Sequence, residues 1–448
     1  MMTRFFRPTI LSAILCVALA LLPRVAAATD IQKVVSPAGI EVWLIEDHTV
    51  PVVSLSFGFK GGTAADPKGK EGVAKLASGL FDEGAGELDS SAFQQRIADL
   101  GLDYGFEASA DSFSGSLRSL TQNKDAAADL LALALTQPRF DPEPVERMRR
   151  QFLIAIEGEE RDPGSAAYRM LETKLLGEHP YARSNYGTRE TMSALGADDL
   201  KQFVKDRLTR DQLHVAAAGD IDAAALGKLV DRAFAGLPAT GAPLDVAEAD
   251  VAPAGSLSVV SRDIPQATVL FAQKGVKRED KDFFAVYLMN YVLGGGGFSS
   301  RLMTELREKR GLTYGISTDL VTLDHVGFLT GRFETPNAKV RETLELLRAE
   351  WRRMAAEGPT PEELEAARTY LLGYYPRNLT TTSKAADTLL GIQMNDLGID
   401  YIERRKTEIE AVTIADVKRV AGALLDEKAL TIVVAGKPEG IEGTVPVQ

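Results

Sequence analysis

The sequence is poor in cysteine and histidine. Its 448 residues include one cysteine and four histidines. No intrachain disulfide can form, and a His-rich metal site would have few ligands to draw on. Positive charge is also in deficit, because 51 lysines and arginines face 63 aspartates and glutamates, which gives a net charge of -12. Nucleic-acid-binding proteins normally present a basic surface, so this composition argues against that class.

The rest of the composition is that of an ordinary globular protein. Hydrophobic residues make up 45% and charged residues 25% of the chain, which excludes a disordered or fibrous protein. At roughly 100 to 200 residues per domain, the length predicts two to four domains. Beyond residue 22 no apolar run approaches the roughly 20 residues that span a bilayer, so no stable membrane span is expected after the first segment.

The first 28 residues have the three parts of a secretory signal. Arg4 and Arg7 form a positive start, residues 8–22 form an apolar middle, and residues 26–28 are three alanines suited to cleavage. An uncleaved membrane anchor is the alternative interpretation, although the apolar run is short for a span. We therefore expect an exported protein, either periplasmic or secreted.

Cleavage of this signal would change the chain in two ways. Cys16 would leave with it, so the mature protein would contain no cysteine. Loss of the three arginines Arg4, Arg7 and Arg24 would change the net charge from -12 to -15. Lipid attachment at Cys16 is not expected, because the bulky Leu15 precedes it.

Three short segments recur along the chain in the same order. They are GLDYG at 101–105 with GLTYG at 311–315, DPEPVE at 141–146 with TPEELE at 360–365, and LHVAAAG at 213–219 with LTIVVAG at 430–436. The offsets between partners are 210, 219 and 217 residues. This period is far too long for a solenoid repeat, so it predicts two homologous domains.

A stretch rich in proline, alanine, glycine and acidic residues separates the two halves. Residues 237–256 read LPATGAPLDVAEADVAPAGS and have no apolar period, which is typical of a surface linker. We predict a first domain over residues 30–237, a linker over 238–256 and a second domain over 257–448.

Each half mixes strands and helices. Apolar alternation predicts strands over residues 40–45, 52–57 and 113–120, the first two paired with each other. Helical periodicity and capping signals predict helices over residues 126–135, 142–157 and 339–357 and another from residue 361 onward. Strands run together and helices run together, so we predict an α+β fold with antiparallel sheets covered by helices.

Four consecutive glycines, Gly294, Gly295, Gly296 and Gly297, precede a charged helical pattern over residues 299–310. Such a run is costly inside a helix or strand, so a flexible loop with accessible amides is expected. The lysine and hydroxyl of a phosphate-binding P-loop are missing. A plain hinge is the structural alternative, and the cations of the helix suit the negative end of its dipole.

The segment GGGGFSSRLMTELREKRGLTYG at residues 294–315 resembles the C-terminal-domain signature of the pitrilysin/insulinase metallopeptidases, which include mitochondrial processing peptidase. The segment His179-Pro180-Tyr181 also resembles a family segment, and the resemblance covers nearly the whole mature chain. It implies two homologous domains that form half of a four-domain clamshell, and it favours substrate contact by the glycine loop.

The resemblance also assigns roles to Arg307 and Tyr314. They match, at the family's spacing, an arginine and a tyrosine that reach the active site of a facing domain. In the family this pair holds the substrate backbone and helps to stabilise the developing oxyanion. Both side chains donate hydrogen bonds to negative charge, so they are chemically suited to that task.

The zinc site of the family is where this chain departs from the pattern. Members that cleave peptides carry H-x-x-E-H on a first-domain helix, where two histidines bind zinc and the glutamate is the general base. Here Lys75 and Gly79 stand at the histidine positions, Ser78 at the glutamate position and Ala155 at the third ligand. Glu157 is two residues from Ala155 and therefore on another helix face. We expect no metal in this chain.

The chain thus retains the arginine and tyrosine and lacks the zinc ligands. The resemblance implies a non-catalytic subunit whose H-x-x-E-H homologue supplies the zinc, acting on a peptide or unfolded polypeptide held by strand addition. One alternative is a non-proteolytic scaffold or peptide-binding protein of the same fold. Another is a hydrolase with a different metal arrangement or a serine nucleophile, although no G-x-S-x-G motif is present.

Overall fold

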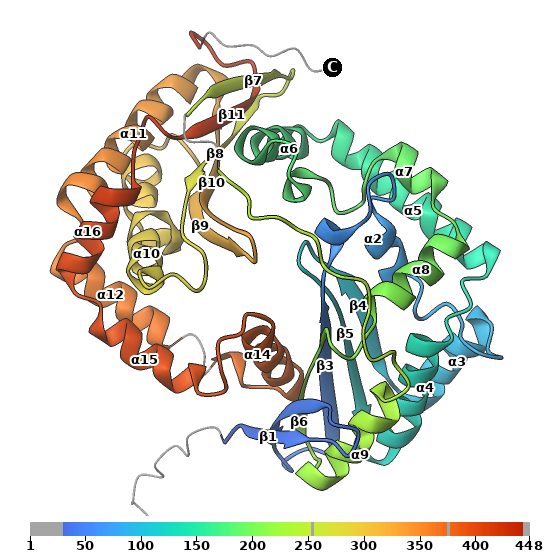
Figure 1. Cartoon of the computed structure of the whole chain (residues 1–448). Helices are drawn as coiled ribbons and strands as arrows, with labels where there is room; N and C mark the ends of the chain where they lie inside the picture. Colours follow the sequence, from blue (N-terminus) through green and yellow to red (C-terminus); the bar gives the residue numbers. More distant parts are fainter. Residues whose placement is uncertain (1–29, 252–254, 374–376, 442–448) are drawn as a thin grey trace, which may run out of the picture.

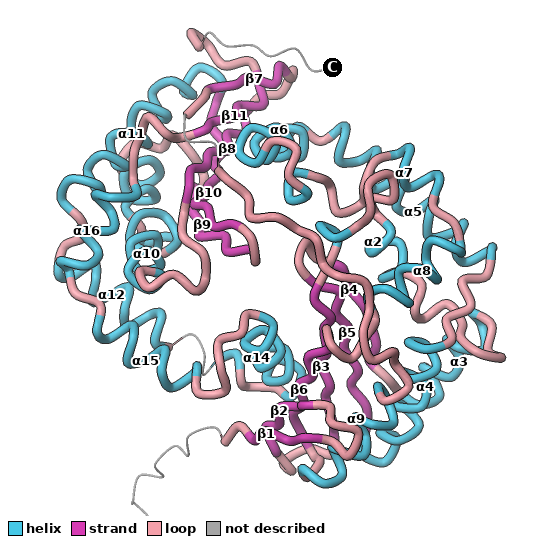
Figure 2. The backbone as a smooth tube through the Cα atoms, in the orientation of Figure 1, coloured by secondary structure: helices cyan, strands magenta, loops and turns pink. Residues whose placement is uncertain are grey.

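A computed structural model of the chain describes residues 30–251, 255–373 and 377–441, so the predicted signal segment lies outside the described residues. These ranges form two halves, each a β-sheet with helices packed on it (Figure 1), and Figure 2 shows most helices outside the strands, with α6 (Pro163–Leu176) and α14 (Thr382–Met394) on the inner side. No helix in these ranges is long and apolar enough to cross a membrane.

The first sheet has six strands. In sheet order they are β1 (Gln32–Val35), β2 (Glu41–Glu46), β6 (Leu213–Gly219), β3 (Val52–Lys60), β5 (Ser112–Leu120) and β4 (Asp103–Ala108). Strands β2 and β6 run parallel, and the other neighbours are antiparallel. The predicted pairing of 40–45 with 52–57 is wrong, because β6 lies between β2 and β3. Strand β6 lies about 170 residues after β2 in the sequence. The spacing of neighbouring strands therefore could not predict that β6 inserts between β2 and β3.

The second sheet repeats this arrangement. In sheet order its strands are β7 (Leu257–Ser261), β11 (Thr431–Gly436), β8 (Gln266–Lys274), β10 (Val326–Pro336) and β9 (Ile316–Leu323). With β1 set aside, both sheets have the same order, and both have one parallel pair, here β7 with β11. The predicted antiparallel sheets are therefore correct except for one pairing in each.

Helices pack on both sheets, and most of them enclose the two main hydrophobic cores. In the first half they are α2 (Val73–Ser78), α3 (Ser90–Leu100), α4 (Lys124–Thr136), α5 (Pro142–Arg161), α6 (Pro163–Leu176), α7 (Arg189–Ala194), α8 (Ala197–Arg207) and α9 (Ala223–Phe234). In the second half they are α10 (Phe283–Asn290), α11 (Val340–Glu357), α12 (Pro361–Leu372), α14 (Thr382–Met394), α15 (Tyr401–Ala411) and α16 (Ile414–Leu424).

The repeated GLxYG segment ends a helix in each half. Gly101 and Gly311 both have φ of +61°, in the left-handed region that glycine adopts without strain. The amide of the following leucine, Leu102 or Leu312, reaches back to a carbonyl of the last helical turn at 3.1 or 2.9 Å. The motif recurs because both halves need the same sharp change from helix to strand.

Each half also lends one helix to the other half's sheet (Figure 1). Helix α6 of the first half packs on β8 and β11, where Leu171 and Leu175 share a buried apolar cluster with Leu270 and Val433. Helix α14 of the second half packs on β3 and β6. This exchange covers the second face of both sheets and joins the halves into one body.

The α14 contact is more polar than the α6 contact. Ser56 of β3 donates a hydrogen bond to Asp387 of α14 at 2.6 Å, and the hydroxyls of Ser54 and Thr382 are 2.8 Å apart. The buried serine hydroxyls of β3 therefore find their hydrogen-bond partners on α14, as buried polar groups generally require.

Candidate functional site

Helix α2 and its C-cap Gly79 carry three of the four positions that the sequence resemblance assigns to the zinc site. The helix begins after Gly72, whose φ is +94°, and a buried carboxylate holds its start. Asp66 accepts hydrogen bonds from the amides of Gly72 at 2.8 Å and Ala74 at 3.2 Å. Burial raises the pKa of Asp66 to about 7, against the lowering effect of these amides.

The side chains on α2 offer no metal ligand. The Lys75 ammonium lies 5.5 Å from the centre of the Tyr186 ring, a cation–π contact. The Ser78 hydroxyl donates to the backbone carbonyl of Lys75 at 2.8 Å. Gly79 faces Met148 of α5, whose sulfur would lie 2.8 Å from a Cβ atom at that position. A cation, an engaged hydroxyl and a thioether thus occupy this region.

The fourth position is equally unsuited. Ala155 lies on α5, and the nearby Glu157 forms an ion pair with Arg161 on the same helix. Glu159 is paired with Arg169 at 2.7 Å. Over the described ranges, no group of three or more His, Cys, Asp or Glu side chains is arranged to hold a metal ion.

The two other predicted site residues lie in the second half. Residues 301–308 are helical, with a π-helical stretch Met303–Glu308 that bears Arg307, and Tyr314 precedes β9. The Arg307 guanidinium lies 4.6 Å from the ring centre of Phe298. Tyr314 is 84% exposed and Phe298 is 65% exposed. The segment therefore presents two exposed aromatic side chains, with the half-buried Arg307 against one of them.

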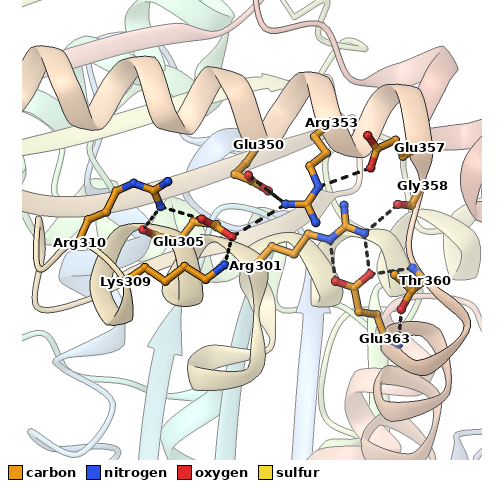
Figure 3. Close-up of polar contacts among 10 residues, drawn as sticks. All are labelled: Arg301, Glu305, Lys309, Arg310, Glu350, Arg353, Glu357, Gly358, Thr360 and Glu363. Carbon is orange, nitrogen blue, oxygen red and sulfur yellow. Dashed lines mark hydrogen bonds and ion pairs between the residues drawn. The ribbon is translucent and has the colours of Figure 1, made fainter.

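A buried ion pair anchors this segment (Figure 3). Arg301 is only 6% exposed and binds Glu363 through two hydrogen bonds of 2.7 and 2.6 Å. It also donates to the Gly358 carbonyl at 2.9 Å. Burial alone would raise the pKa of Glu363. The hydrogen bonds from the Arg301 guanidinium and the Thr360 amide outweigh this effect and hold that pKa below its ordinary value.

Glu363 has a second role that ties the segment to α12. The Thr360 hydroxyl accepts a hydrogen bond from the Glu363 amide at 3.2 Å, and the Glu363 carboxylate accepts one from the Thr360 amide at 2.7 Å. This is the capping box of α12. Sequence reasoning identified the cap and missed Arg301, because nothing local indicates a partner 62 residues away.

A second group of charges supports the end of the same segment (Figure 3). Glu305 pairs with Lys309 at 2.6 Å and with Arg310 at 2.7 Å. Arg353 of α11 pairs with Glu350 at 3.3 Å and lies 3.9 Å from Glu305. The lysine and arginine around Arg307 are thus engaged within the protein, while Arg307 contacts an exposed aromatic ring.

The four glycines differ from the expected flexible loop. Residues Tyr291–Gly295 form a π-helical turn that continues α10, and Gly294 is buried. A Cβ atom on Gly294 would lie 2.5 Å from the hydroxyl oxygen of Thr318, and one on Gly296 would lie 2.8 Å from the Tyr291 carbonyl oxygen. Close packing explains these two glycines, whereas Gly297 is exposed with open space around it.

Two family models match the chain. The family described as "Insulinase (Peptidase family M16)" matches residues 41–189, and the family described as "Peptidase M16 inactive domain" matches residues 194–371. The chain belongs to the M16 family. This confirms the resemblance found in the sequence.

Relatives within the M16 family extend over nearly the whole chain. The chain is 26% identical over 403 residues to the "Non-peptidase homolog YmxG" of Helicobacter pylori, covering 89% of this chain and 92% of that protein. It is 22% identical over 431 residues to the mitochondrial-processing peptidase subunit beta of Lentinula edodes, covering 93% and 88%.

Solved structures show the same fold. A crystal structure of a peptidase M16 inactive domain from Pseudomonas fluorescens has a TM-score of 0.86 and 28% identity, and it covers 94% of this chain and 100% of that one. The chain is therefore an M16 homologue of the two-domain fold.

Proposed function

We propose that this protein is the non-catalytic, Arg307- and Tyr314-bearing subunit of an exported zinc peptidase. The observation that carries the proposal is the exposure of Tyr314, 84%, in a chain whose own zinc positions hold Lys75 and Gly79. A solvent-exposed tyrosine hydroxyl contributes little to the stability of the fold. It is available to a substrate held by another chain.

In this function the partner is a homologous subunit that carries H-x-x-E-H and zinc. The metal would polarise the scissile carbonyl of a peptide or unfolded polypeptide. The Tyr314 hydroxyl and the Arg307 guanidinium would donate hydrogen bonds to the developing oxyanion and to the substrate backbone. The Arg301–Glu363 pair would hold the segment that bears them in place, because preorganised donors lose little energy to reorganisation.

Export belongs to the same proposal and rests on the sequence of residues 1–28. These residues combine Arg4 and Arg7 with an apolar run and three alanines. The mature protein would then work in the periplasm or outside the cell. Sequencing the N-terminus of the protein purified from its own source tests this point, and retention of residues 1–28 would contradict it.

Reconstitution tests the function. The mature chain and an H-x-x-E-H homologue from the same organism are purified separately, and zinc content and peptide cleavage are measured for each and for the mixture. We expect zinc only in the homologue and full activity only in the mixture. A control mixture with the homologue's glutamate changed to glutamine should be inactive.

Two results would contradict the proposal. Stoichiometric zinc and peptidase activity in the lone chain would make it a hydrolase in its own right. A stable complex without any gain in activity over the homologue alone would favour the scaffold alternative, in which Arg307 and Tyr314 take no part in catalysis.

A further inference from the structure

A cavity of about 390 Å³ lies where α14 leaves the second half to reach the first sheet. The helices α10, α14 and α15 and the end of β9 form its walls. One part of its wall is apolar, formed by Phe283, Phe284, Tyr287, Leu320, Ile392 and Leu397. Its polar wall includes Arg278, Arg405, Asn378 and Asn395, and no aspartate or glutamate lines it among the described residues. The volume is within the range of small-molecule sites.

Arg278 has an unusual setting for a cation in an acidic protein. Its guanidinium carbon lies 3.8 Å from the ring centre of Phe283 and 5.2 Å from that of Tyr401. It donates a hydrogen bond to the Tyr401 hydroxyl. Within the described ranges it forms no ion pair with a carboxylate. Stacking covers the face of the guanidinium and leaves N–H groups at its edge for a partner in the same plane.

Asp280 accepts a hydrogen bond from the Asp282 amide at 2.8 Å. Most of the other carboxylates near Arg278 pair with other cations, and they line an adjoining cavity that also includes Arg278. Their pairs are Glu279 with Lys277 at 2.8 Å, Asp282 with Arg419 at 2.7 Å, Asp396 with Lys60 at 2.8 Å, and Glu408 with Arg404 at 2.7 Å. The first cavity therefore combines an uncompensated guanidinium with an apolar wall.

We propose that this cavity binds a compact carboxylate with an apolar body. The carboxylate would accept hydrogen bonds from the edge of Arg278, the geometry in which arginine binds carboxylates best. The apolar body would pack on Phe284, Tyr287 and Ile392. Arg405 also lines the cavity and donates to the Leu371 carbonyl at 2.9 Å.

Two sources share this chemistry, a free N-acylated amino acid and the carboxyl-terminal residue of a peptide. Either would bridge α14 and α10, so binding would stabilise the contact between the two halves. The site goes beyond the proposed function and does not depend on a partner subunit. Its failure and the failure of that function can therefore be told apart.

Titration calorimetry and thermal unfolding of the full mature chain test the site. The probes are N-acetyl-L-phenylalanine and its amide, together with a tripeptide ending in phenylalanine as the free acid and as the amide. We expect the acid to bind and raise the melting temperature, and the amide to bind about tenfold more weakly or worse. Equal binding of both peptide and amino-acid acids would assign the site to peptide ends, and binding of the small acid alone would assign it to metabolites.

Variants separate the site from general charge effects. Arg278→Gln should reduce the affinity for the acid about tenfold or more. Arg278→Lys retains the charge but loses the planar pair of N–H donors, so its affinity should lie between those of wild type and Arg278→Gln. Arg262→Gln is the matched control, since within the described residues the Arg262 side chain donates only to the Ser261 carbonyl. Equal affinity for acid and amide, no binding of the acid at millimolar concentration, or unchanged binding in a folded Arg278→Gln variant would overturn the proposal.

Discussion

Tyr104 and Tyr314 occupy the same place in the two repeats, three residues after the glycine that ends a helix, yet their environments are opposite. The Tyr104 ring packs 5.2 Å from the Phe106 ring, and its hydroxyl donates to the Phe81 carbonyl at 3.4 Å. Burial raises the pKa of Tyr104 well above its ordinary value. Tyr314 is 84% exposed. The two repeats therefore pack one tyrosine against the core and leave the other exposed.

This contrast predicts different effects of removing each hydroxyl. Tyr314→Phe should lower turnover by the reconstituted complex about 100-fold, as loss of one oxyanion donor does, without lowering stability. Tyr104→Phe should leave turnover unchanged and alter only the unfolding free energy, by about 1 kcal/mol or less. Tyr370→Phe serves as a second control, because Tyr370 is 47% exposed and packs on Tyr291. Turnover and urea unfolding check these values.

Arg307→Ala should behave like Tyr314→Phe. Its guanidinium lies against the exposed Phe298 ring, so its loss should cost the fold about 1 kcal/mol or less. Turnover should fall at least tenfold. Arg332→Ala is the control, since Arg332 forms an exposed ion pair with Glu334 at 3.2 Å. Wild-type turnover in Arg307→Ala would remove this residue from the mechanism.

The Arg301–Glu363 pair should dominate the stability of the second half. Its arginine side chain is 5% exposed, and removing one member of a buried pair leaves the other charge uncompensated. Arg301→Ala should cost about 3 kcal/mol or more in unfolding free energy. Arg353→Ala, in the partly exposed group of Figure 3, should cost about 1 kcal/mol or less.

A double-mutant cycle checks that the two residues act together. The combined loss in Arg301→Ala/Glu363→Ala should be smaller than the sum of the two single losses. Additive losses would mean that each residue acts through separate contacts, such as the Gly358 carbonyl or the Thr360 amide.

Close packing around Gly294 predicts a position-specific cost of a single methyl group. Gly294→Ala should lose about 1–3 kcal/mol, because the new Cβ would lie 2.5 Å from a Thr318 atom in a buried site. Gly315→Ala, with nothing within 4 Å of its Cβ, should change stability by less than about 0.5 kcal/mol. Chemical denaturation measures both. A stable Gly294→Ala variant with impaired turnover would instead point to substrate contact.

Asp66 predicts a pH dependence of stability. Its pKa is about 7 in the folded protein and about 3.9 in an unfolded chain, so between these values the folded state binds more protons. Its contribution to stability is complete below about pH 4 and is lost as the pH rises through about 7. Asp66→Asn lacks this titration, so its unfolding free energy relative to wild type should rise from pH 5 to pH 8.

A surface carboxylate provides the control for this pH series. The Thr413 hydroxyl and amide lower the pKa of Asp416, so it is ionised in both states between pH 5 and pH 8. Asp416→Asn should therefore differ from wild type by a constant amount over that range. A constant difference for Asp66→Asn as well would show that Asp66 is ionised in the folded protein.

Much of the fold follows from local signals in the sequence. The helix predicted from residue 142 starts there, the helix predicted over 339–357 is α11 (Val340–Glu357), and the strand predicted over 113–120 is β5 (Ser112–Leu120). Periodicity, proline at the first turn and capping residues act over a few residues, so they can be read without the fold. The unsuited zinc positions and the Arg307–Tyr314 spacing are equally local.

Tertiary structure alone decided the remaining features. Strand β6 lies between β2 and β3, α6 and α14 exchange sheets, Arg301 meets Glu363, and Arg278 faces an apolar cavity. Each depends on residues from about 60 to more than 300 positions apart, whose contact energies are set only when the sheets close. The amino-acid sequence determined the elements, the duplication and the residues available for chemistry. Long-range packing determined which of them are buried, which are paired and which face solvent.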